Sequence, residues 1–357
     1  MPTPLRVGLI GCGNICRAHL PAYQGYADRV ALTAVCDSVD ERARRVAESF
    51  RLAERWTDFE RFVREAPIDA VDICLPHHLH YAAARAALEA GKHVLVEKPF
   101  AIRMTECIEL VETAERYGLI LMVAQMQRYN ATYARLRQMI ADGELGPIRH
   151  ARIDAIQNLH DYAEPPHWLY DGTRAGGGSV ISVAVHRIDL LRYLIGDFKQ
   201  AIALARTVDP AFSAAEDYCV ALLECDNGAL VDLFSTYAAA GLPYSEMFWI
   251  YGDAGVVHTL PAEGQAINPH PRLALKRGTK SGRQFSPLEP LTGLFPTDNP
   301  FVNEILHFAQ CCATGEEPLS SGRDNLGTMA TIFAIYESAR RGGRPVSVAA
   351  MRNAGAA

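Results

Sequence analysis

Short apolar runs alternate with longer amphipathic segments along the first 125 residues of the chain. The runs are rich in valine, isoleucine and leucine, as buried strands are, and the segments between them place apolar residues at helical spacing. The predicted strands cover residues 5–11, 30–37, 70–76, 93–99 and 119–125, and the predicted helices cover 17–26, 41–50, 80–91 and 105–118. Because parallel strands need crossover connections, this alternation predicts a parallel sheet with helices on both faces.

The pattern changes after residue 148. Apolar and polar residues then alternate in pairs of runs joined by turn sequences, which is typical of antiparallel strands. These strands are predicted over 150–161, 201–210, 217–238 and 246–260, helices over 183–196, 299–315 and 322–343, and an irregular segment over 262–300. One face of this sheet has no predicted covering element, so we expect it to be buried against another copy of the chain, in a homodimer or homotetramer.

Bulk composition excludes several classes of protein. A length of 357 residues favours two domains, and the net charge of −6 argues against a nucleic-acid-binding protein. No apolar run approaches the roughly 20 residues that a membrane span needs, and the N-terminus has no secretory pattern. The nine cysteines follow no disulfide or zinc-binding spacing. We therefore expect a reduced, cytoplasmic protein with no membrane partner.

The sequence VGLIGCGNIC, residues 7–16, predicts a strand that turns directly into a helix. Gly11 permits a tight turn, and Gly13 lets backbone N–H groups approach a pyrophosphate at the start of the helix. Asp37 ends the second predicted strand, at the distance where a carboxylate accepts hydrogen bonds from ribose hydroxyls and repels a 2′-phosphate. The pattern favours NAD over NADP, although Arg42 and Arg44 lie nearby; the alternative is an ordinary turn with a capping aspartate.

A second candidate stretch covers residues 71–101, where two neighbouring strands end. His77, His78 and His80 follow one strand, but no nearby cysteine or carboxylate completes a metal site, so we expect no metal. The next strand ends in Glu97-Lys98-Pro99. A partly desolvated lysine beside a cationic nicotinamide has a lowered pKa and can share a substrate proton. The alternative is a surface lysine paired with Glu97.

The third stretch covers residues 176–196 and begins with three glycines, which allow a close backbone approach before a helix. Ser182 and His186 are four residues apart on the predicted helix, and Asp189 follows three residues after His186. His186 is a candidate proton carrier, and the alternative is a histidine that is satisfied within the core.

Taken in order, these motifs resemble the Gfo/Idh/MocA oxidoreductases, which include glucose–fructose oxidoreductase and inositol dehydrogenases. The matching stretches are G-x-G at 11–13, LPHHLH at 75–80, AGKHVLVEKP at 90–99 and the glycine triplet followed by H-x-x-D at 176–189. The resemblance runs from about residue 5 to residue 348. It implies an α/β chain: an NAD-binding Rossmann domain at 1–126, and a C-terminal α+β substrate and oligomerisation domain at 127–357 with a large, mostly antiparallel open sheet.

The resemblance also implies site residues. Lys98 and His186 become the acid–base pair. The cofactor-binding residues become Gly11, Gly13, Asn14, Ile15, Asp37, Ser38, Leu75, Pro76, His77, His80, Glu97, Lys98 and Arg128. Four positions depart from the family pattern, and at three of them Cys16 replaces a glycine or alanine, Leu75 a threonine or serine, and His77 an asparagine. The departure with the largest consequence is Ser182, because the family often has an aspartate there that raises the basicity of the histidine.

We therefore expect an NAD(H)-dependent dehydrogenase that moves a hydride between the nicotinamide and a secondary hydroxyl or ketone of a sugar, polyol or sugar derivative. The residues expected to face this substrate are Lys98, Arg128, Asn158, His160, Trp168, Arg174, Ser182 and His186. The arginines leave room for an acidic sugar. Two alternatives stay open: an enzyme that keeps and recycles its bound NAD, and a non-catalytic regulator that senses a dinucleotide and a ligand on the same scaffold.

Overall fold

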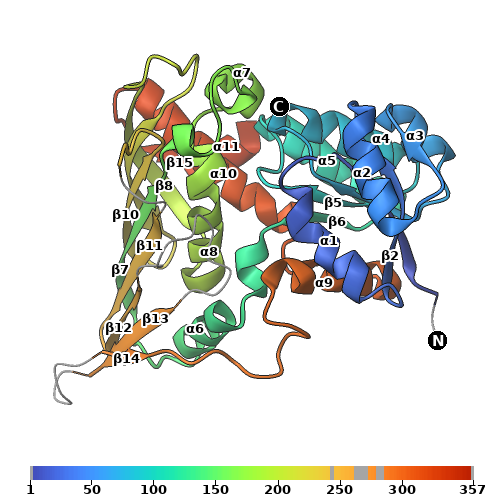
Figure 1. Ribbon diagram of the computed structural model, residues 1–357. Coiled ribbons are helices and arrows are strands. Elements are labelled where there is room, and N and C mark those ends of the chain that lie inside the picture. The colour runs from blue at the N-terminus through green and yellow to red at the C-terminus, as the bar shows by residue number, and fades with distance from the viewer. Residues whose placement is uncertain (1–2, 242–244, 261–271, 279–284, 355–357) are drawn as a thin grey trace. The chain divides into compact units, whose positions relative to one another are not determined.

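The computed structural model describes residues 3–241, 245–260, 272–278 and 285–354 (Figure 1). The chain forms two compact units. Unit 1 comprises Met1–Met126 and Asn299–Asn325, and unit 2 comprises Gln127–Asp298 and Leu326–Ala357. These units differ in one segment from the domains predicted at 1–126 and 127–357, because residues 299–325 return to unit 1.

Unit 1 is built on a six-stranded parallel sheet with the order β3-β2-β1-β4-β5-β6. Its strands are β1 (Leu5–Ile10), β2 (Val30–Cys36), β3 (Arg55–Trp56), β4 (Ala70–Ile73), β5 (His93–Glu97) and β6 (Leu121–Ala124). Ile10 lies beside Ile73, which lies beside Val96. The strand order reverses at β1, and α/β sheets bind ligands at the carboxyl ends of strands at such a point.

The helices of unit 1 begin and end where local chemistry favours it. Asp58 starts α3 by accepting the N–H groups of Glu60 and Arg61, and Gly118 ends α5 in the left-handed conformation. The helices are α1 (Cys16–Gly25), α2 (Asp40–Phe50), α3 (Phe59–Glu65), α4 (His80–Glu89), α5 (Met104–Tyr117) and α9 (Pro300–Thr314). Helix α9 packs on α1, where the ring of Phe301 lies 6.0 Å from that of His19. This packing explains why residues 299–325 join unit 1.

Unit 2 contains a nine-stranded sheet with the order β14-β13-β12-β11-β7-β10-β9-β8-β15. Strands β7 and β10 pair in parallel, and the other neighbours pair antiparallel. The strands are β7 (Ile148–Ile156), β8 (Phe198–Arg206), β9 (Tyr218–Cys225), β10 (Leu230–Thr236), β11 (Ser245–Gly252), β12 (Gly255–Thr259), β13 (Leu273–Arg277), β14 (Ser286–Pro287) and β15 (Val346–Ser347). The predicted fold class, a Rossmann domain followed by a large and mostly antiparallel sheet, is confirmed.

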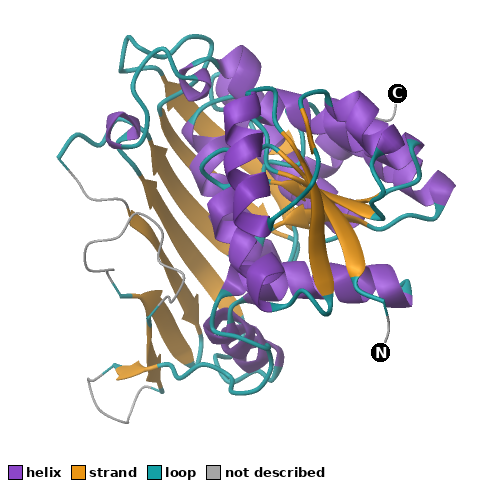
Figure 2. Ribbon diagram, turned by 45° about the vertical axis from the view of Figure 1, so that its right-hand side comes forward, coloured by secondary structure: helices purple, strands orange, loops and turns teal. Residues whose placement is uncertain are grey.

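Helices cover one face of this sheet (Figure 2). They are α6 (Ala131–Ala141), α7 (Gly172–Ala175), α8 (Val185–Ile195), α10 (Gly322–Arg340) and α11 (Val348–Ala354), with a π-helix over Val180–Ala184. On the opposite face, Leu204, Val220 and Phe234 lie side by side across β8, β9 and β10, and Leu204 and Val220 are about half exposed. Among the described residues no helix is long and apolar enough to cross a membrane.

The prediction of an irregular segment over residues 262–300 is wrong in part. Strands β13 and β14 fall inside it and extend the sheet, with β13 pairing to β12. The run LALKR of β13 is too short to show a clear alternation of its own, so its strand conformation depends on the neighbouring strand. Residues 262–271 and 279–284 of the same prediction lie outside the described part of the chain.

Candidate functional site

The glycine turn after β1 has the geometry that its sequence predicts. Gly11 has a positive φ of +97°, and a Cβ there would lie 2.3 Å from the carbonyl oxygen of Cys74. A Cβ on Gly13 would meet no atom within 4 Å among the described residues, so the space above this glycine is open. Asn14 is exposed, Ile15 directly precedes α1, and the Cys16 thiol donates to the Gly13 carbonyl oxygen at 3.0 Å. Cys16 therefore fits the third small position of the motif.

Asp37 follows β2 and holds the glycine turn in place. Its Oδ2 accepts the backbone N–H of Cys12 at 2.8 Å, and its Oδ1 accepts that of Val39 at 2.8 Å. The carboxylate is buried, whereas the neighbouring Ser38 is exposed. Each carboxylate oxygen accepts more than one hydrogen bond, so Asp37 retains capacity for ribose hydroxyls.

The segment after β4 is fixed by His80. Its Nδ1 lies 2.7 Å from the carbonyl oxygen of Pro99, and its Nε2 lies 2.8 Å from that of Leu75. Burial lowers the pKa of His80, against the two backbone contacts that raise it. His77 is buried with its ring 5.8 Å from that of His80, and Pro76 precedes this short turn. His80 therefore ties the ends of β4 and β5 together.

Lys98 stands at the carboxyl end of β5. Its backbone N–H donates to its neighbour's carboxylate, Oε2 of Glu97, at 2.9 Å. Glu97 is buried, and Lys98 is partly exposed. The glycine turn, Leu75 and Lys98 thus follow three adjacent strands and share one edge of the sheet.

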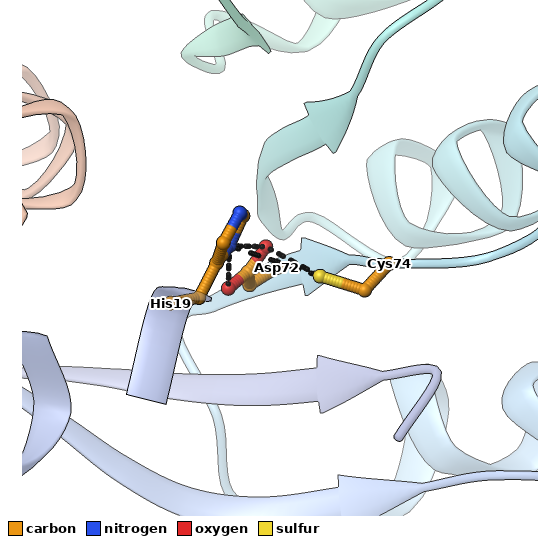
Figure 3. A group of neighbouring side chains, drawn as sticks. All are labelled: His19, Asp72 and Cys74. Atoms are coloured by element: carbon orange, nitrogen blue, oxygen red, sulfur yellow. Dashed lines mark hydrogen bonds and ion pairs between the residues drawn. The ribbon is translucent and has the colours of Figure 1, made fainter. Parts of the chain in front are cut away.

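A buried polar cluster beneath this edge was not predicted from the sequence. His19, Asp72 and Cys74 bring one ligand-type atom each within 4.8 Å of one another (Figure 3). His19 extends from α1 toward Asp72 of β4, and Tyr23 donates its hydroxyl to Asp72 Oδ2 at 2.8 Å. One signal was available in the sequence: an aspartate inside the apolar run of residues 70–76 requires a partner.

The residues of unit 1 fit a dinucleotide. The open space over Gly13 admits a phosphate, and no side chain of the described residues caps the first turn of α1, where an anion can bind. Just beyond β6, both polar atoms of the Gln125 amide are buried without a hydrogen-bond partner among the described residues. A ligand at this edge of the sheet can satisfy such an amide.

In unit 2, the glycine triplet accommodates the protein's own atoms. A Cβ on Gly177 would lie 2.2 Å from the hydroxyl of Tyr336, and one on Gly178 would collide with the backbone of Glu216. The buried Glu216 carboxylate accepts the N–H groups of Gly178 at 2.8 Å and Val180 at 2.9 Å. Sequence reasoning found the triplet but missed Glu216, which caps the helical segment that leads to His186.

His186 is the second residue of α8 and is partly exposed. The helix predicted at 183–196 is preceded by a π-helical turn over Val180–Ala184, which contains Ser182. Ser182 is buried within this turn. Single π-helical turns are frequent at functional sites.

Arg128 and Asp189 form a buried ion pair in unit 2. The guanidinium Nε and Nη2 atoms of Arg128 each lie 2.7 Å from an oxygen of Asp189, and Thr328 donates to the same carboxylate at 2.8 Å. Both side chains are almost fully buried, at 3% and 0% exposure. Arg128 was predicted to face the cofactor and substrate; in unit 2 this guanidinium is engaged by Asp189.

The other residues predicted to face the substrate lie between β7 and the π-helical turn. Asn158 donates to Asp161 at 2.9 Å, and His160 Nε2 lies 2.6 Å from Asp209 Oδ2 on the surface. Trp168 is partly exposed beside His167, and Arg174 is exposed. Their role toward a substrate remains a prediction.

Glu216 predicts a pH dependence of stability. Burial raises its pKa to about 7, although the backbone N–H groups act in the opposite direction. An acid with a raised pKa binds more protons in the folded protein, so its contribution to stability is complete at low pH and is lost as pH rises through about 7. Between pH 4.5 and pH 7 this loss amounts to about 3 kcal/mol in the free energy of unfolding.

Denaturation of the wild type and of Glu216→Gln across this pH range measures the effect. We expect the difference in unfolding free energy between the two proteins to change by that amount, because the variant cannot titrate at this position. A constant difference would show that Glu216 keeps an ordinary pKa.

Both units match one family of proteins. Residues 5–125 match the oxidoreductase family with an NAD-binding Rossmann fold, and residues 133–258 match the GFO/IDH/MocA C-terminal domain. Together the two matches cover more than half of the chain. The chain therefore belongs to the Gfo/Idh/MocA oxidoreductases, and its N-terminal unit is an NAD-binding Rossmann domain.

Individual relatives agree with this assignment. D-apiose dehydrogenase of Paraburkholderia graminis is 29% identical over 94% of this chain and 87% of its own. D-xylose 1-dehydrogenase (NADP(+)) 2 of Haloferax volcanii is 28% identical over 94% of this chain and 97% of its own. The solved structure of levoglucosan dehydrogenase in complex with NADH and levoglucosan superposes with a TM-score of 0.85, at 26% identity, over 97% of this chain and 99% of its own.

Proposed function

We propose that the protein is an NAD(H)-dependent dehydrogenase of a sugar, polyol or sugar derivative, acting at a secondary hydroxyl or its ketone. The observation that carries this proposal is the position of Lys98 in an NAD-binding Rossmann domain. Lys98 follows the carboxyl end of β5, directly after the buried Glu97, and Asp37 follows β2, three strands away at the same edge of the sheet. The names of the relatives, which are dehydrogenases of apiose, xylose and levoglucosan, support the substrate class.

In this proposal, His186 takes the proton of the substrate hydroxyl, while the Lys98 ammonium donates a hydrogen bond to the same oxygen as negative charge develops there. The bound nicotinamide supplies the acceptor for the hydride. Ser182 stands where relatives often carry an aspartate, and it cannot add negative charge near His186. In this proposal the departure of the proton therefore depends on Lys98 and His186.

We propose NAD rather than NADP as the cofactor. The Asp37 carboxylate at the end of β2 repels a 2′-phosphate. Arg44, which lies on α2 nearby, is already bound to Glu41 at 2.8 Å and Glu48 at 2.7 Å. Arg42, on the same helix, is exposed and its charge reaches Cys12 in the glycine turn, so the comparison with NADP is the test of this choice.

For the substrate side we propose Arg128, Asn158, His160, Trp168, Arg174 and Ser182, besides Lys98 and His186. The exposed Arg174 carries a charge that can bind a carboxylate, which keeps acidic sugars among the candidates. Arg128, by contrast, can act mainly by fixing the helix that carries His186, since Asp189 holds its guanidinium.

A screen of NAD-coupled absorbance against sugars, inositols, uronates and their lactones tests the proposal, with NADP run in parallel. We expect reduction of NAD with at least one sugar or polyol, and a lower kcat/KM with NADP. The absence of any reduction across the panel would leave the alternative of a ligand-sensing regulator. Purified protein that carries NAD which added NAD does not replace would indicate the recycling mechanism instead.

We also propose that the open face of the unit 2 sheet is covered by a second copy of the chain. Leu204, Val220 and Leu222 are each about half exposed on neighbouring strands, which leaves an apolar stripe in contact with water. Light scattering should give two or four times the chain mass of 39.2 kDa, and Val220→Lys should lower it. A wild-type mass of one chain would contradict the proposal.

A further inference from the structure

We propose that His19 is a positioning residue for Lys98, and that it acts as a buried imidazolium through the carboxylate of Glu97. The proposal rests on the proposed function for the catalytic role of Lys98. Its structural basis, a chain of contacts from α1 to β5 within unit 1, is independent of that role.

One side of the His19 ring is bound to β4. Its Nδ1 lies 2.9 Å and 3.1 Å from the two oxygens of Asp72 (Figure 3). Tyr23, one turn further along α1, donates to the same carboxylate at 2.8 Å. His19 and Asp72 are fully buried, so water does not compete for these contacts.

The other side of the ring is bound to β5. Nε2 of His19 lies 3.1 Å from Oε1 of Glu97, and the second oxygen of Glu97 accepts the backbone N–H of Lys98 at 2.9 Å. Pro99 follows Lys98, and its carbonyl oxygen lies 2.7 Å from Nδ1 of His80. The main chain on either side of the Lys98 side chain is therefore held by two buried histidines, one of them through Glu97.

Both ring nitrogens of His19 face carboxylates, and only the doubly protonated ring can donate to both. Burial lowers the pKa of His19, but the charge and hydrogen bonds of Asp72, with the hydrogen bond to the Cys74 sulfur, more than offset it and raise the pKa well above its ordinary value. Two further titratable groups lie on the elements around His19 in the described part of the chain: Cys16, whose thiol interacts electrostatically with His19 from α1, and the buried Glu304, which follows Phe301 on α9.

The Cys74 thiol completes the cluster as a neutral group. Its Sγ lies 3.7 Å from Nδ1 of His19 and 3.6 Å from Asp72 Oδ1. Burial raises the pKa of this thiol well above its ordinary value, so it stays protonated. A metal ion would need the thiolate and a neutral imidazole. The contacts of Asp72 with His19 and with Cys74 account for the placement of both side chains.

The arrangement links two parts of the proposed site. Helix α1 begins at the glycine turn, and His19 joins this helix to the residue before Lys98. Loss of the Nε2 contact is expected to free the Glu97 carboxylate and let the Lys98 main chain shift. Misplacement of a reacting group by about 1 Å costs up to about 100-fold in rate.

Two variants separate the two sides of the ring. In His19→Gln the amide reaches toward Glu97, as Nε2 does, whereas in His19→Asn the shorter amide reaches only toward Asp72. We expect His19→Asn to lower kcat about 10-fold or more, with little change in KM, and His19→Gln to retain most of the activity. His93→Gln is the matched control, because His93 lies at the opposite end of β5. If His19→Gln and His19→Asn lost the same amount of activity, in proportion to the fall in their melting temperatures, the positioning role would be overturned.

Two further measurements require no turnover and therefore remain informative if the proposed function fails. Nitrogen NMR of the folded protein at pH 8 should show both ring nitrogens of His19 protonated, where a histidine of ordinary pKa, about 6.5, is neutral. Hydrogen exchange should show a protected Lys98 amide in the wild type and an unprotected one in His19→Asn. A neutral His19 ring, or one zinc ion per chain in the purified protein, would overturn the imidazolium assignment.

Discussion

Lys98→Met and His186→Asn are each expected to lower kcat by about 10²- to 10⁴-fold on the substrate that the screen identifies. Methionine keeps the unbranched stem of lysine, one atom shorter, and removes its charge, so the developing negative charge on the substrate oxygen loses its hydrogen-bond donor. Asparagine keeps a polar group at residue 186 but cannot accept a proton. Steady-state kinetics of the two variants and of the double variant measure the effect.

The double variant shows whether the two residues serve one step. The effects of substituting residues that act as a unit are not additive. The double variant should therefore lose about as much activity as the less active of the two single variants. Lys92→Met is the control. Lys92 directly precedes β5, at the opposite end of the strand from Lys98, and its ammonium group donates to the carbonyl oxygen of Ile68. Unchanged turnover in either single variant would refute its assignment, and multiplied losses would refute the pairing.

Asp189→Ala is expected to destabilise the protein by about 3–5 kcal/mol, the largest effect on folding that the structure predicts. The substitution leaves the guanidinium of Arg128 buried without its carboxylate, and Thr328 loses its acceptor. Charges that are taken out of water and lose their partner retain the full cost of desolvation. Denaturant unfolding of the variant measures the loss in unfolding free energy.

The ion pair of Arg149 and Asp253 provides the control. Its N–O distance of 2.6 Å is as short as that of the buried pair, but the side chains are 65% and 49% exposed. Asp253→Ala should therefore cost at most about 1 kcal/mol. If Asp189→Ala cost no more than Asp253→Ala, other groups would be stabilising Arg128.

The sequence predicts the parts of the fold that depend on local pattern. Strand–helix alternation identifies the parallel sheet of unit 1, and the alternation in runs such as 217–238 identifies the antiparallel sheet. What it does not predict depends on distant partners: α9 joins unit 1 because it packs on α1, and β13 becomes a strand because β12 pairs with it. The π-helical turn before α8 follows from the close approach of Glu216 and Tyr336 to the glycines.

The site divides in the same way. Gly11, Gly13, Asp37 and Lys98 belong to stretches in which spacing carries the chemistry, and the structure places them at one edge of the sheet. His19 lies on a helix and Glu216 in the loop before β9, and nothing local indicates their partners, which lie 53 and 38 residues away. Residue 128 illustrates the limit, since an arginine next to a predicted site can also be a buried structural ion.

The path of the chain restricts how this protein can be recombined. Because residues 299–325 belong to unit 1, neither unit is one continuous stretch. A fragment that stopped at residue 126 would lack α9 and would uncover the side of α1 on which Phe301 meets His19. A chimaera that exchanges the nucleotide-binding part with a relative must therefore transfer two separate pieces of gene, and a single crossover point would divide a packed core.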